Sequence, residues 1–422
     1  MKQNRLISVL IVNFNKGDVI HETIQSVLNQ TYQNLQVIII DDGSNDQSVE
    51  VIKDYSQKDS RIEYYINDRN RGVCWSTNFG FAKIRGEYLA RIDSDDLWEN
   101  DKLEKQMAFM DAHDGCRICF TGVDLIDEAG RSINEKESEL LERFNTPELS
   151  REENLRYFFI KGNYLAHSTV MMLSSFQKQL GNFNYIYGQL HDLEYWVRAV
   201  KLTHIYKMQQ RLVKMRRFSN KKNMSASTKE RVIRHLNEHF IIRSHFFENL
   251  DDELFASAFR CLFRNPEAST AEQYTCEKLF LLRGEYRKPI AYQFFLGMLK
   301  AEECFIDPRV RERLEKDYNY TPLTYYKEME KHMYYDEFVE DRLNTNVQEI
   351  AELNERIHKL KESLDELVKQ HEVSEKEHLK ELEHLKDDNE KMKRTLSEIS
   401  TSTSWRLTAP VRKLLDTVKW HK

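Results

Sequence analysis

Three carboxylates stand together in the segment Asp93-Ser94-Asp95-Asp96, directly after an apolar run at residues 88–92 that predicts a β-strand. Carboxylates this close repel one another, and burial at a strand end is costly for them unless a cation lies between them. Hard divalent ions such as Mg²⁺ and Mn²⁺ prefer oxygen ligands, and Mg²⁺ often binds one or two carboxylates together with substrate phosphates. The segment therefore predicts a metal–nucleotide site. The structural alternative is an acidic turn in which Asp95 or Asp96 caps a following helix.

The elements around this segment alternate between predicted strands and helices, which is typical of a Rossmann-like, doubly wound, mainly parallel α/β sheet. Four apolar runs predict the strands, at residues 7–12, 35–40, 61–66 and 88–92. Helical spacing lies between them, at residues 19–30, 48–55 and 75–82. Ligands of such a sheet bind at the carboxyl ends of its strands. Polar clusters follow all four strands, at Asn13, Asp41-Asp42, residues 67–72 and residues 93–96, so the sequence predicts one shared site.

The chain has 422 residues, which is too many for one ordinary core, so two or three structural units are expected. Charged residues make up 31% of the chain and its mean hydropathy is −0.68. These values indicate a globular part joined to a long, charged helical part. The net charge of −6 gives no case for a nucleic-acid binder.

The six cysteines are scattered along the chain. The one close pair, Cys116 and Cys119, lies in an apolar run that predicts packing rather than redox or zinc chemistry. Apolar runs fall short of the roughly 18–20 residues that span a bilayer, and no signal peptide precedes the first strand. We therefore expect a protein of the reducing cytoplasm.

The later part of the chain predicts helices. From Leu343 onward the apolar spacing is heptad, which predicts a parallel homo-oligomeric coiled coil, with one long solvated helix as the alternative. The seam turns polar between His371 and His378 and resumes in a register shifted by about four residues, as at a stutter. We predict four parts: residues 1–225, a helical domain at 226–337, the coiled coil at 338–400 and a tail at 401–422.

The tail predicts a basic amphipathic helix after Pro410, with Trp405 before it and Trp420 near its end. Such a helix suits the headgroup layer of an anionic membrane, so we expect peripheral contact with the inner face of the cell membrane. The alternative is a helix docked onto the protein's own surface. An oligomer would place several tails on one bilayer, and multivalency would strengthen a weak attachment.

Taken together and in order, the motifs of residues 1–225 resemble a family-2 glycosyltransferase, an inverting enzyme with the GT-A fold. Val12-Asn13-Phe14-Asn15 stands where the family usually has Pro-x-Tyr-Asn, and Gly181-Asn182-Phe183 is similar to its Gly-Gly-Phe segment. The other matching segments are residues 26–32, Asp41-Asp42-Gly43-Ser44, Asn70-Arg71-Gly72 and the Asp-x-Asp motif, here Asp93-Ser94-Asp95. Residues 404–410 look like a tail seen on many bacterial enzymes that build surface polysaccharides.

The resemblance implies a donor-binding role for each matched residue. It implies that Asp41, with Asp42 beside it, accepts a hydrogen bond from the uracil ring, and that Asn13, Asn70 and Arg71 line the nucleotide pocket. Asp93 would lie near the ribose or the donor sugar. Asp95, assisted by Asp96 and Asp93, would bind the Mn²⁺ or Mg²⁺ ion on the diphosphate. The physical logic agrees, because a divalent cation stabilises the charge that builds up on a departing nucleoside diphosphate.

An acceptor hydroxyl is a poor nucleophile until a base takes its proton. His191-Asp192-Leu193-Glu194 is similar to the family's acidic motif at a helix start, which makes Asp192 the general base and Glu194 the reserve candidate. The structural alternative for Asp192 is a helix N-cap. Asn163 and His167 would face the sugars or support the core.

Arg217-Phe218-Ser219 resembles the family's Arg-x-His loop that closes over the diphosphate. Ser219 replaces the His, which can be a metal ligand in relatives. Arg216 or Arg217 would contact phosphate through charge-assisted hydrogen bonds.

The resemblance implies transfer of a sugar from a nucleotide donor, most simply a UDP-sugar, to a hydroxyl of a glycan or lipid-linked glycan in cell-surface polysaccharide synthesis. A non-catalytic sugar-nucleotide-binding scaffold, organised by the coiled coil, is the alternative of a different class. A nucleotidyltransferase is disfavoured because no Gly-rich loop with a basic residue follows the first strand.

Overall fold

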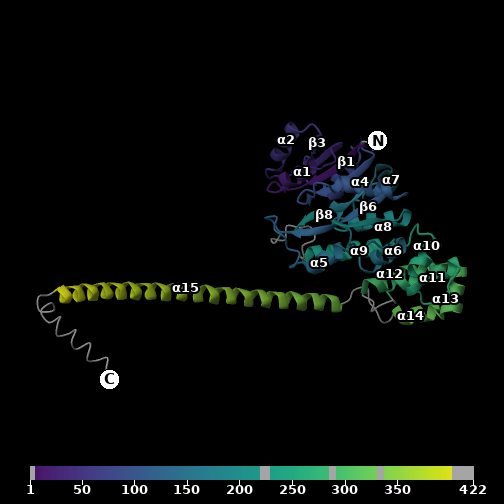
Figure 1. Ribbon diagram of the computed structural model, residues 1–422. Coiled ribbons are helices and arrows are strands. Elements are labelled where there is room, and N and C mark those ends of the chain that lie inside the picture. The colour runs from purple at the N-terminus through teal and green to yellow at the C-terminus, as the bar shows by residue number, and fades with distance from the viewer. Residues whose placement is uncertain (1–4, 219–228, 285–290, 330–336, 402–422) are drawn as a thin grey trace, which may run out of the picture. The chain divides into compact units, whose positions relative to one another are not determined.

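The computed structural model describes residues 5–218, 229–284, 291–329 and 337–401 (Figure 1). The chain divides into two compact units, residues 1–334 and residues 335–422, and each is described by itself. None of the helices in the described ranges has both the length and the apolar character needed to cross a bilayer.

The parallel half of the sheet forms where the sequence predicts it. Its strands lie in the order β3-β2-β1-β4 and comprise β1 (Ile7–Asn13), β2 (Leu35–Asp41), β3 (Ile62–Ile66) and β4 (Tyr88–Asp93). Alternate residues of β1 enter two different cores. Leu10 packs in the core of helix α3 (Val73–Phe81), whereas Val9 and Ile11 pack in the core of α1 (Ile20–Leu28) and α2 (Ser48–Lys58). Helices therefore cover both faces, which explains the unbroken apolar runs.

The other half of the sheet is mixed. It comprises β5 (Leu97–Trp98), β6 (Ile118–Ile126), β7 (Met171–Leu173) and β8 (Tyr206–Arg216), and the complete order is β3-β2-β1-β4-β7-β6-β8-β5. Strand β7 is antiparallel to both β4 and β6, β5 is antiparallel to β8, and β6 is parallel to β8. The predicted parallel pairing therefore holds for the first four strands, whereas the rest of the sheet is mixed, with one parallel pair and three antiparallel pairs.

Helices and turns of the α/β part fix the segments that carry the site. They are α4 (Lys102–Ala112), α5 (Ser138–Phe144), α6 (Arg151–Ile160), the 3₁₀ turn η1 (His167–Thr169), α7 (Ser174–Leu180) and α8 (His191–Leu202). Trp196 of α8 is fully buried, and its ring meets Phe120 of β6 edge-on with centroids 4.8 Å apart. This packing fixes α8, and with it the first turn that holds Asp192.

The helical region continues the core of the α/β part. It comprises α9 (Lys229–Ser244), α10 (Asp252–Phe259), the 3₁₀ turn η2 (Arg260–Leu262), α11 (Ala271–Leu282), α12 (Ala291–Ile306), α13 (Pro308–Tyr318) and α14 (Pro322–Met329). Phe159 of α6 packs against the rings of Phe246, Phe247 and Phe259, at centroid distances of 5.0, 5.1 and 5.5 Å. The segment from α9 to α10 is thus joined to α6 of the α/β part by a shared aromatic cluster.

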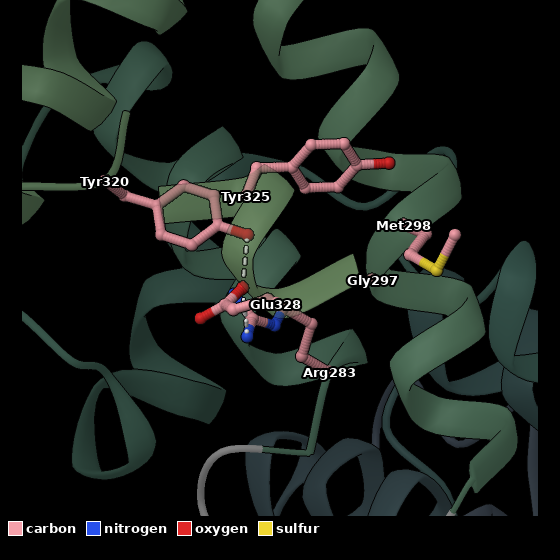
Figure 2. Close-up of a pocket in the computed structure, with 6 residues that line it drawn as sticks. All are labelled: Arg283, Gly297, Met298, Tyr320, Tyr325 and Glu328. Atoms are coloured by element: carbon pink, nitrogen blue, oxygen red, sulfur yellow. Dashed lines mark hydrogen bonds and ion pairs between the residues drawn. The ribbon is translucent and has the colours of Figure 1, made fainter. Parts of the chain in front are cut away.

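A small pocket lies among the helices of this region (Figure 2). Glu328 accepts a hydrogen bond from the Tyr320 hydroxyl at 2.8 Å and pairs with Arg283 Nη2 at 2.7 Å. Gly297 is required beside them, since a Cβ there would lie 1.8 Å from Arg283 Cγ. The contacts are those of helix packing.

The second unit contains one helix, α15 (Glu337–Thr401), which is continuous over 65 residues. At 1.5 Å per residue it is about 98 Å long. Every residue between 352 and 400 whose side chain is described is exposed, including the predicted seam. The predicted tail helix after Pro410 lies outside the described residues.

Candidate active site at the carboxyl ends of the parallel strands

Three neighbouring strands end in Asn13, Asp41 and Asp93, which brings these residues to one edge of the sheet as the sequence predicts. Asn13 pairs with Asp41 in the β1–β2 register, and Val12 pairs with Asp93 in the β1–β4 register. The acidic and amide side chains of three segments far apart in sequence thus meet at the edge where ligands of parallel sheets bind.

Asp41 is buried and organises the turn after β2. Asn13 Nδ2 donates to Asp41 Oδ2 at 2.7 Å, and Ser44 donates to the same carboxylate through its backbone N–H at 2.8 Å and its hydroxyl at 2.7 Å. Asn13 Oδ1 is buried and has no hydrogen-bond partner among the described residues. A buried acceptor without a donor costs about 1–3 kcal/mol. The Asn13 amide is therefore a place where a ligand N–H or O–H would be accepted.

Asp42 holds the loop that follows β3. Its Oδ1 accepts from Asn67 Nδ2 at 2.7 Å, from the backbone N–H of Arg71 at 2.9 Å and from the Ser76 hydroxyl at 2.8 Å. Its Oδ2 accepts from the backbone N–H of Gly72 at 2.9 Å. Asp42 thus shapes the predicted nucleotide pocket by fixing the backbone of residues 67–72.

The same loop passes directly over Gly43. This glycine has φ +74°, and a Cβ there would lie 2.4 Å from the carbonyl carbon of Arg69. The Arg71 guanidinium pairs with Asp68 at 2.8 Å and lies 4.7 Å from the centre of the Trp75 ring. Asn70 and Arg71 therefore lie on the loop where the sequence predicts them, but the Arg71 side chain is directed toward Asp68 and Trp75.

Asp93 is the open member of the acidic segment, with a side chain that is 44% exposed. Arg91 Nη2 lies 3.2 Å from its Oδ1, and its backbone N–H donates to the Ser168 hydroxyl at 3.0 Å. Arg91 is buried and contacts His167, and burial lowers the pKa of both groups. His167 therefore supports the floor of the site, as in the core alternative.

Asp95 is largely buried, and its Oδ2 lies 2.5 Å from the ammonium of Lys16. The same ammonium lies 4.0 Å from the centre of the Phe218 ring. Burial raises the pKa of Asp95, and Lys16 opposes that shift. The lysine thus places a positive charge where the sequence predicts a metal ion.

The donor set fits the predicted divalent ion through two carboxylates, Asp93 and Asp95. Among the described residues, no group of three or more His, Cys, Asp and Glu side chains is arranged to hold a metal. Mg²⁺ often uses one or two carboxylates, with substrate phosphates and water as the remaining ligands. Asp93 and Asp95 are thus the carboxylates that would meet an ion arriving with a diphosphate.

Asp96 differs from its neighbours because its carboxylate faces inward. Oδ2 accepts from the Ser168 hydroxyl at 2.5 Å and Oδ1 accepts from the backbone N–H of Arg216 at 2.9 Å. Burial raises the pKa of Asp96, and the charges of Asp95 and Asp93 act in the same direction. The residue ties the end of β4 to β8. The N-cap alternative for this segment is wrong, because strand β5 follows it.

Arg216 is committed to the same internal network. Its Nη2 pairs with Glu22 at 2.9 Å, and its Nε and Nη1 donate to the carbonyl groups of Asp95 at 3.0 Å and Glu128 at 2.7 Å. Arg217, partly buried, follows it and donates its backbone N–H to the carbonyl of Ile126 at 2.8 Å. Ser219 lies outside the described residues.

Asp192 lies in the first turn of α8 and is hydrogen-bonded at both oxygens. Asn163 Nδ2 donates to Oδ2 at 2.7 Å, and the backbone N–H of Leu193 donates to Oδ1 at 2.7 Å. Burial raises the pKa of Asp192 to about 6, against the hydrogen bonds and the charge of Arg91. Leu190 occupies the N-cap position, so the capping alternative is wrong. A carboxylate whose pKa is about 6 suits a general base, because it is ionised at neutral pH and basic enough to accept a proton.

Glu194 is less suited to that role, because it makes a two-pronged ion pair with Arg198 at 2.7 and 3.0 Å. A residue of α9 positions Asp192, the candidate base. Glu238 is buried and accepts the backbone N–H groups of Gly188, Gln189 and Leu190 at 2.8, 2.9 and 2.7 Å. The helical region thus fixes the loop that leads into Asp192.

Sequence reasoning missed four residues that shape this site: Lys16, Arg91, Ser168 and Glu238. Lys16 lies three residues after Asn13, at the end of the first strand, so its closeness in sequence to that polar position could have identified it. Arg91 is a charged residue inside an otherwise apolar strand, which signals a buried ion pair. Ser168 and Glu238 carry no comparable signal, because their partners are set by tertiary packing.

Comparison with known proteins gives a family match over the α/β part. Residues 8–181 match the family described as Glycosyl transferase family 2. An uncharacterized glycosyltransferase of Methanocaldococcus jannaschii is 28% identical over 250 residues, which cover 58% of this chain and 83% of that protein. TuaG of Bacillus subtilis, a proposed teichuronic acid biosynthesis glycosyltransferase, is 36% identical over 129 residues, covering 31% of this chain and 51% of TuaG.

The solved structures that resemble this chain do so at low identity. Staphylococcus aureus TarS 1-349 in complex with UDP-GlcNAc has a TM-score of 0.48 at 15% identity, covering 78% of this chain and 93% of TarS 1-349. The Pyrobaculum calidifontis mannosyltransferase PcManGT, in complex with GDP-Man and Mn²⁺, has a TM-score of 0.43 at 14% identity, covering 72% of this chain and 81% of that one.

The family match covers β1 to β4, the acidic segment and the turns that carry Asp41 and Asp42. The site geometry and the match therefore point the same way. Residues 8–181 thus match the glycosyl transferase family 2 model, and this match together with the glycosyltransferase relatives supports a glycosyltransferase.

Proposed function

We propose that this chain is a metal-dependent, inverting glycosyltransferase that moves a sugar from a UDP-sugar to an acceptor hydroxyl. The observation that carries the proposal is the position of Asp93, which lies 3.2 Å from buried Arg91 and whose charge acts on both Asp95 and Asp192. A site for negative charge on a leaving diphosphate and a base for an incoming hydroxyl are thus close together.

The donor occupies the edge of β1, β2 and β4. Asn13 and Asp41 accept hydrogen bonds from the nucleobase, Asp42 holds the loop of Asn70 and Arg71 around the nucleotide, and Asp93 meets the ribose or sugar. Asp95 and Asp93 hold Mn²⁺ or Mg²⁺, which supplies Lewis-acid stabilisation of the diphosphate. Asp96 acts as a positioning residue through Ser168 and Arg216. Arg217 contributes positive charge near the phosphates.

Asp192 acts on the acceptor. Its carboxylate takes the proton of the hydroxyl while the hydroxyl oxygen forms a bond to the anomeric carbon. The bond between that carbon and the diphosphate oxygen breaks, and the electron pair leaves with the nucleoside diphosphate. Because attack comes from the face opposite the leaving group, an α-linked donor gives a β-linked product. Glu194 remains the reserve base, although its pair with Arg198 disfavours it.

The remaining parts serve assembly at a membrane. Residues 338–400 form a coiled coil between copies of the chain, residues 226–337 act as the helical domain behind the base, and residues 401–422 bring the enzyme to the inner face of the cell membrane. The similarity to TuaG, which is named for teichuronic acid biosynthesis, supports an acceptor in surface-polysaccharide synthesis, such as a glycan or lipid-linked glycan.

Turnover of a UDP-sugar with Mn²⁺ and with EDTA tests this proposal. The full chain should transfer or slowly hydrolyse one member of a panel of UDP-sugars, and EDTA should abolish release of UDP. Binding of the same donor without any turnover would support the non-catalytic scaffold instead. Release of UDP at the same rate with Mn²⁺ and with EDTA would contradict the role of Asp93 and Asp95 as metal ligands.

A further inference from the structure

The exposed seam of α15 contains two heptad segments with different registers. The seven positions of each heptad are labelled a to g, and the residues at a and d face the partner helix. In the proximal segment the a positions are Ile357 and Leu364 and the d positions are Leu353, Leu360 and Leu367. In the distal segment the a positions are Leu382, Asn389 and Leu396 and the d positions are Leu385, Met392 and Ile399. Each apolar member is between 43 and 65% exposed in the single chain.

The distal segment carries a polar residue in its seam. Asn389 occupies an a position, with Leu385 and Met392 on the flanking d positions. In a parallel pair in register, a positions face a positions, so two Asn389 side chains would meet and hydrogen-bond. In an antiparallel pair an a position faces a d position of the partner, so each buried amide would face an apolar side chain without a partner, at a cost of about 1–3 kcal/mol. The asparagine therefore favours the parallel arrangement.

The flanking charges favour the same arrangement. Glu381 and Asp388 occupy g positions, and Lys386 and Lys393 occupy the e positions five residues later. In a parallel pair in register each g position lies beside the following e position of the partner, so Glu381 faces Lys386 and Asp388 faces Lys393. In an antiparallel pair, g faces g and e faces e, which sets acid against acid and lysine against lysine.

The proximal segment favours two strands. Isoleucine at a with leucine at d is typical of parallel dimers. Ile357 lies between Leu353 and Leu360 in this pattern, whereas Leu364 at the next a position does not distinguish two strands from more. Its flanking charges add no attraction, since Arg356 at g would face Lys361 at e. The proximal segment thus favours two strands, and the distal segment favours the parallel direction.

We propose that α15 pairs with α15 of a second copy of this chain as a parallel, in-register dimer from Leu353 to Ile399, with the two Asn389 side chains facing each other. The inference rests on the coiled coil of the proposed function and adds the number of strands, their register and the Asn389 pair that fixes the parallel direction. It holds two catalytic units by their C-terminal helices with both tails at the same end, so both tails can meet one membrane.

Cysteine cross-linking of the full chain tests the direction. Leu360→Cys and Leu385→Cys, made separately in a Cys261→Ser background that removes the exposed native thiol, should each give a disulfide-linked dimer under mild oxidation. The two positions lie about 38 Å apart along the helix. In an antiparallel pair a residue meets its own copy at one point of the helix alone, so at most one variant would cross-link. Lys391→Cys, on the outer c position, is the matched control, and this variant should run as a monomer on a non-reducing denaturing gel.

Charge reversal tests the pairing itself. Lys386→Glu with Lys393→Glu should raise the dimer dissociation constant about tenfold or more, because four attractive contacts become repulsive. This variant keeps the pairs that Asp388 makes within its own helix with His384 and Lys391. Adding Glu381→Lys and Asp388→Lys should restore the dimer. An antiparallel pair would be little changed by the first variant, since it exchanges lysine facing lysine for acid facing acid.

Light scattering of the unmodified chain gives the number of strands, and the expected mass is twice 50.5 kDa. A monomer, a trimer or cross-linking at one cysteine alone would overturn the inference. Binding of UDP with Mn²⁺ is measured on every variant, because none alters the candidate active site. Unchanged UDP binding with no dimer would refute this inference alone, whereas a dimer that binds no UDP would count against the proposed function.

Discussion

The ammonium of Lys16 lies 2.5 Å from Asp95 Oδ2, although the two residues are 79 positions apart in the sequence. The pair joins the turn after β1 to the acidic segment after β4. A lysine in this place neutralises the carboxylate that would otherwise meet a divalent ion. Once the ion is bound, the Lys16 ammonium is available to pair with the diphosphate instead of Asp95.

Lys16→Met should therefore tighten binding of Mn²⁺ in the absence of nucleotide, by about tenfold. The physical reason is that the metal no longer competes with an ammonium for Asp95. Titration calorimetry at pH 8 measures the change. Lys58→Met is the control, because Lys58 pairs with Asp54 on the surface of α2 at 2.6 Å. Equal Mn²⁺ affinity in both variants would show that Lys16 does not compete at the metal position.

Asp192→Asn should lower kcat for transfer by about 10²–10⁴-fold while UDP binding stays within experimental error. In the unmodified enzyme kcat/KM should fall as the pH drops through about 6, because burial raises the pKa of Asp192 to about 6 and the protonated acid cannot accept a proton. The residual activity of the Asn variant should lose this acid limb. Near-normal turnover of the variant would move the base to Glu194 or elsewhere.

Asp96→Ala and Asp95→Ala should separate a positioning role from a ligand role. Asp96 accepts hydrogen bonds from Ser168 and from the backbone of Arg216, so its removal should lower the free energy of unfolding by about 2 kcal/mol. Asp95→Ala should leave the unfolding midpoint nearly unchanged and weaken Mn²⁺ binding instead. Urea unfolding and calorimetry measure the two effects. A stable Asp96→Ala protein that has lost its metal affinity would contradict this division.

Gly43→Ala should displace the loop over the nucleotide pocket. The position combines φ +74° with a Cβ placement 2.4 Å from the carbonyl carbon of Arg69, so the loop must move. Gly115→Ala is a matched control, since Gly115 has φ +80° and nothing within 4 Å of a Cβ. Both variants carry the cost of a left-handed alanine, about 1–2 kcal/mol. UDP affinity should fall in Gly43→Ala alone, and a parallel loss in both variants would argue against the steric explanation.

The sequence predicts the parallel half of the sheet closely, for a physical reason. Strands β1 and β2 are buried on both faces, so they appear as unbroken apolar runs and their ends fall within one residue of the prediction. The mixed half gives no such signal. Strand β7 has three residues and β5 has two. Within β8, the exposed stretch Gln209-Gln210-Arg211 lies where the pairing with β6 shifts.

The candidate site divides in a similar way. Asn13, Asp41 and Asp93 lie together because parallel strands end at one edge, which the order of elements already implies. The orientation of each carboxylate could not be predicted. Asp96 faces inward because β8 brings the backbone N–H of Arg216 to it from 120 residues away. Contacts of this range depend on tertiary packing, which the spacing of residues does not encode.

The central claim is that a divalent ion joins the acidic segment to the diphosphate of the donor. Titration calorimetry of UDP into the full chain, with Mn²⁺ and then with EDTA, tests it most directly. We predict clear binding with Mn²⁺ that falls by about tenfold or more with EDTA, and no such dependence in Asp95→Ala. Equal UDP affinity under both conditions, with Mg²⁺ as well as Mn²⁺, would contradict the account.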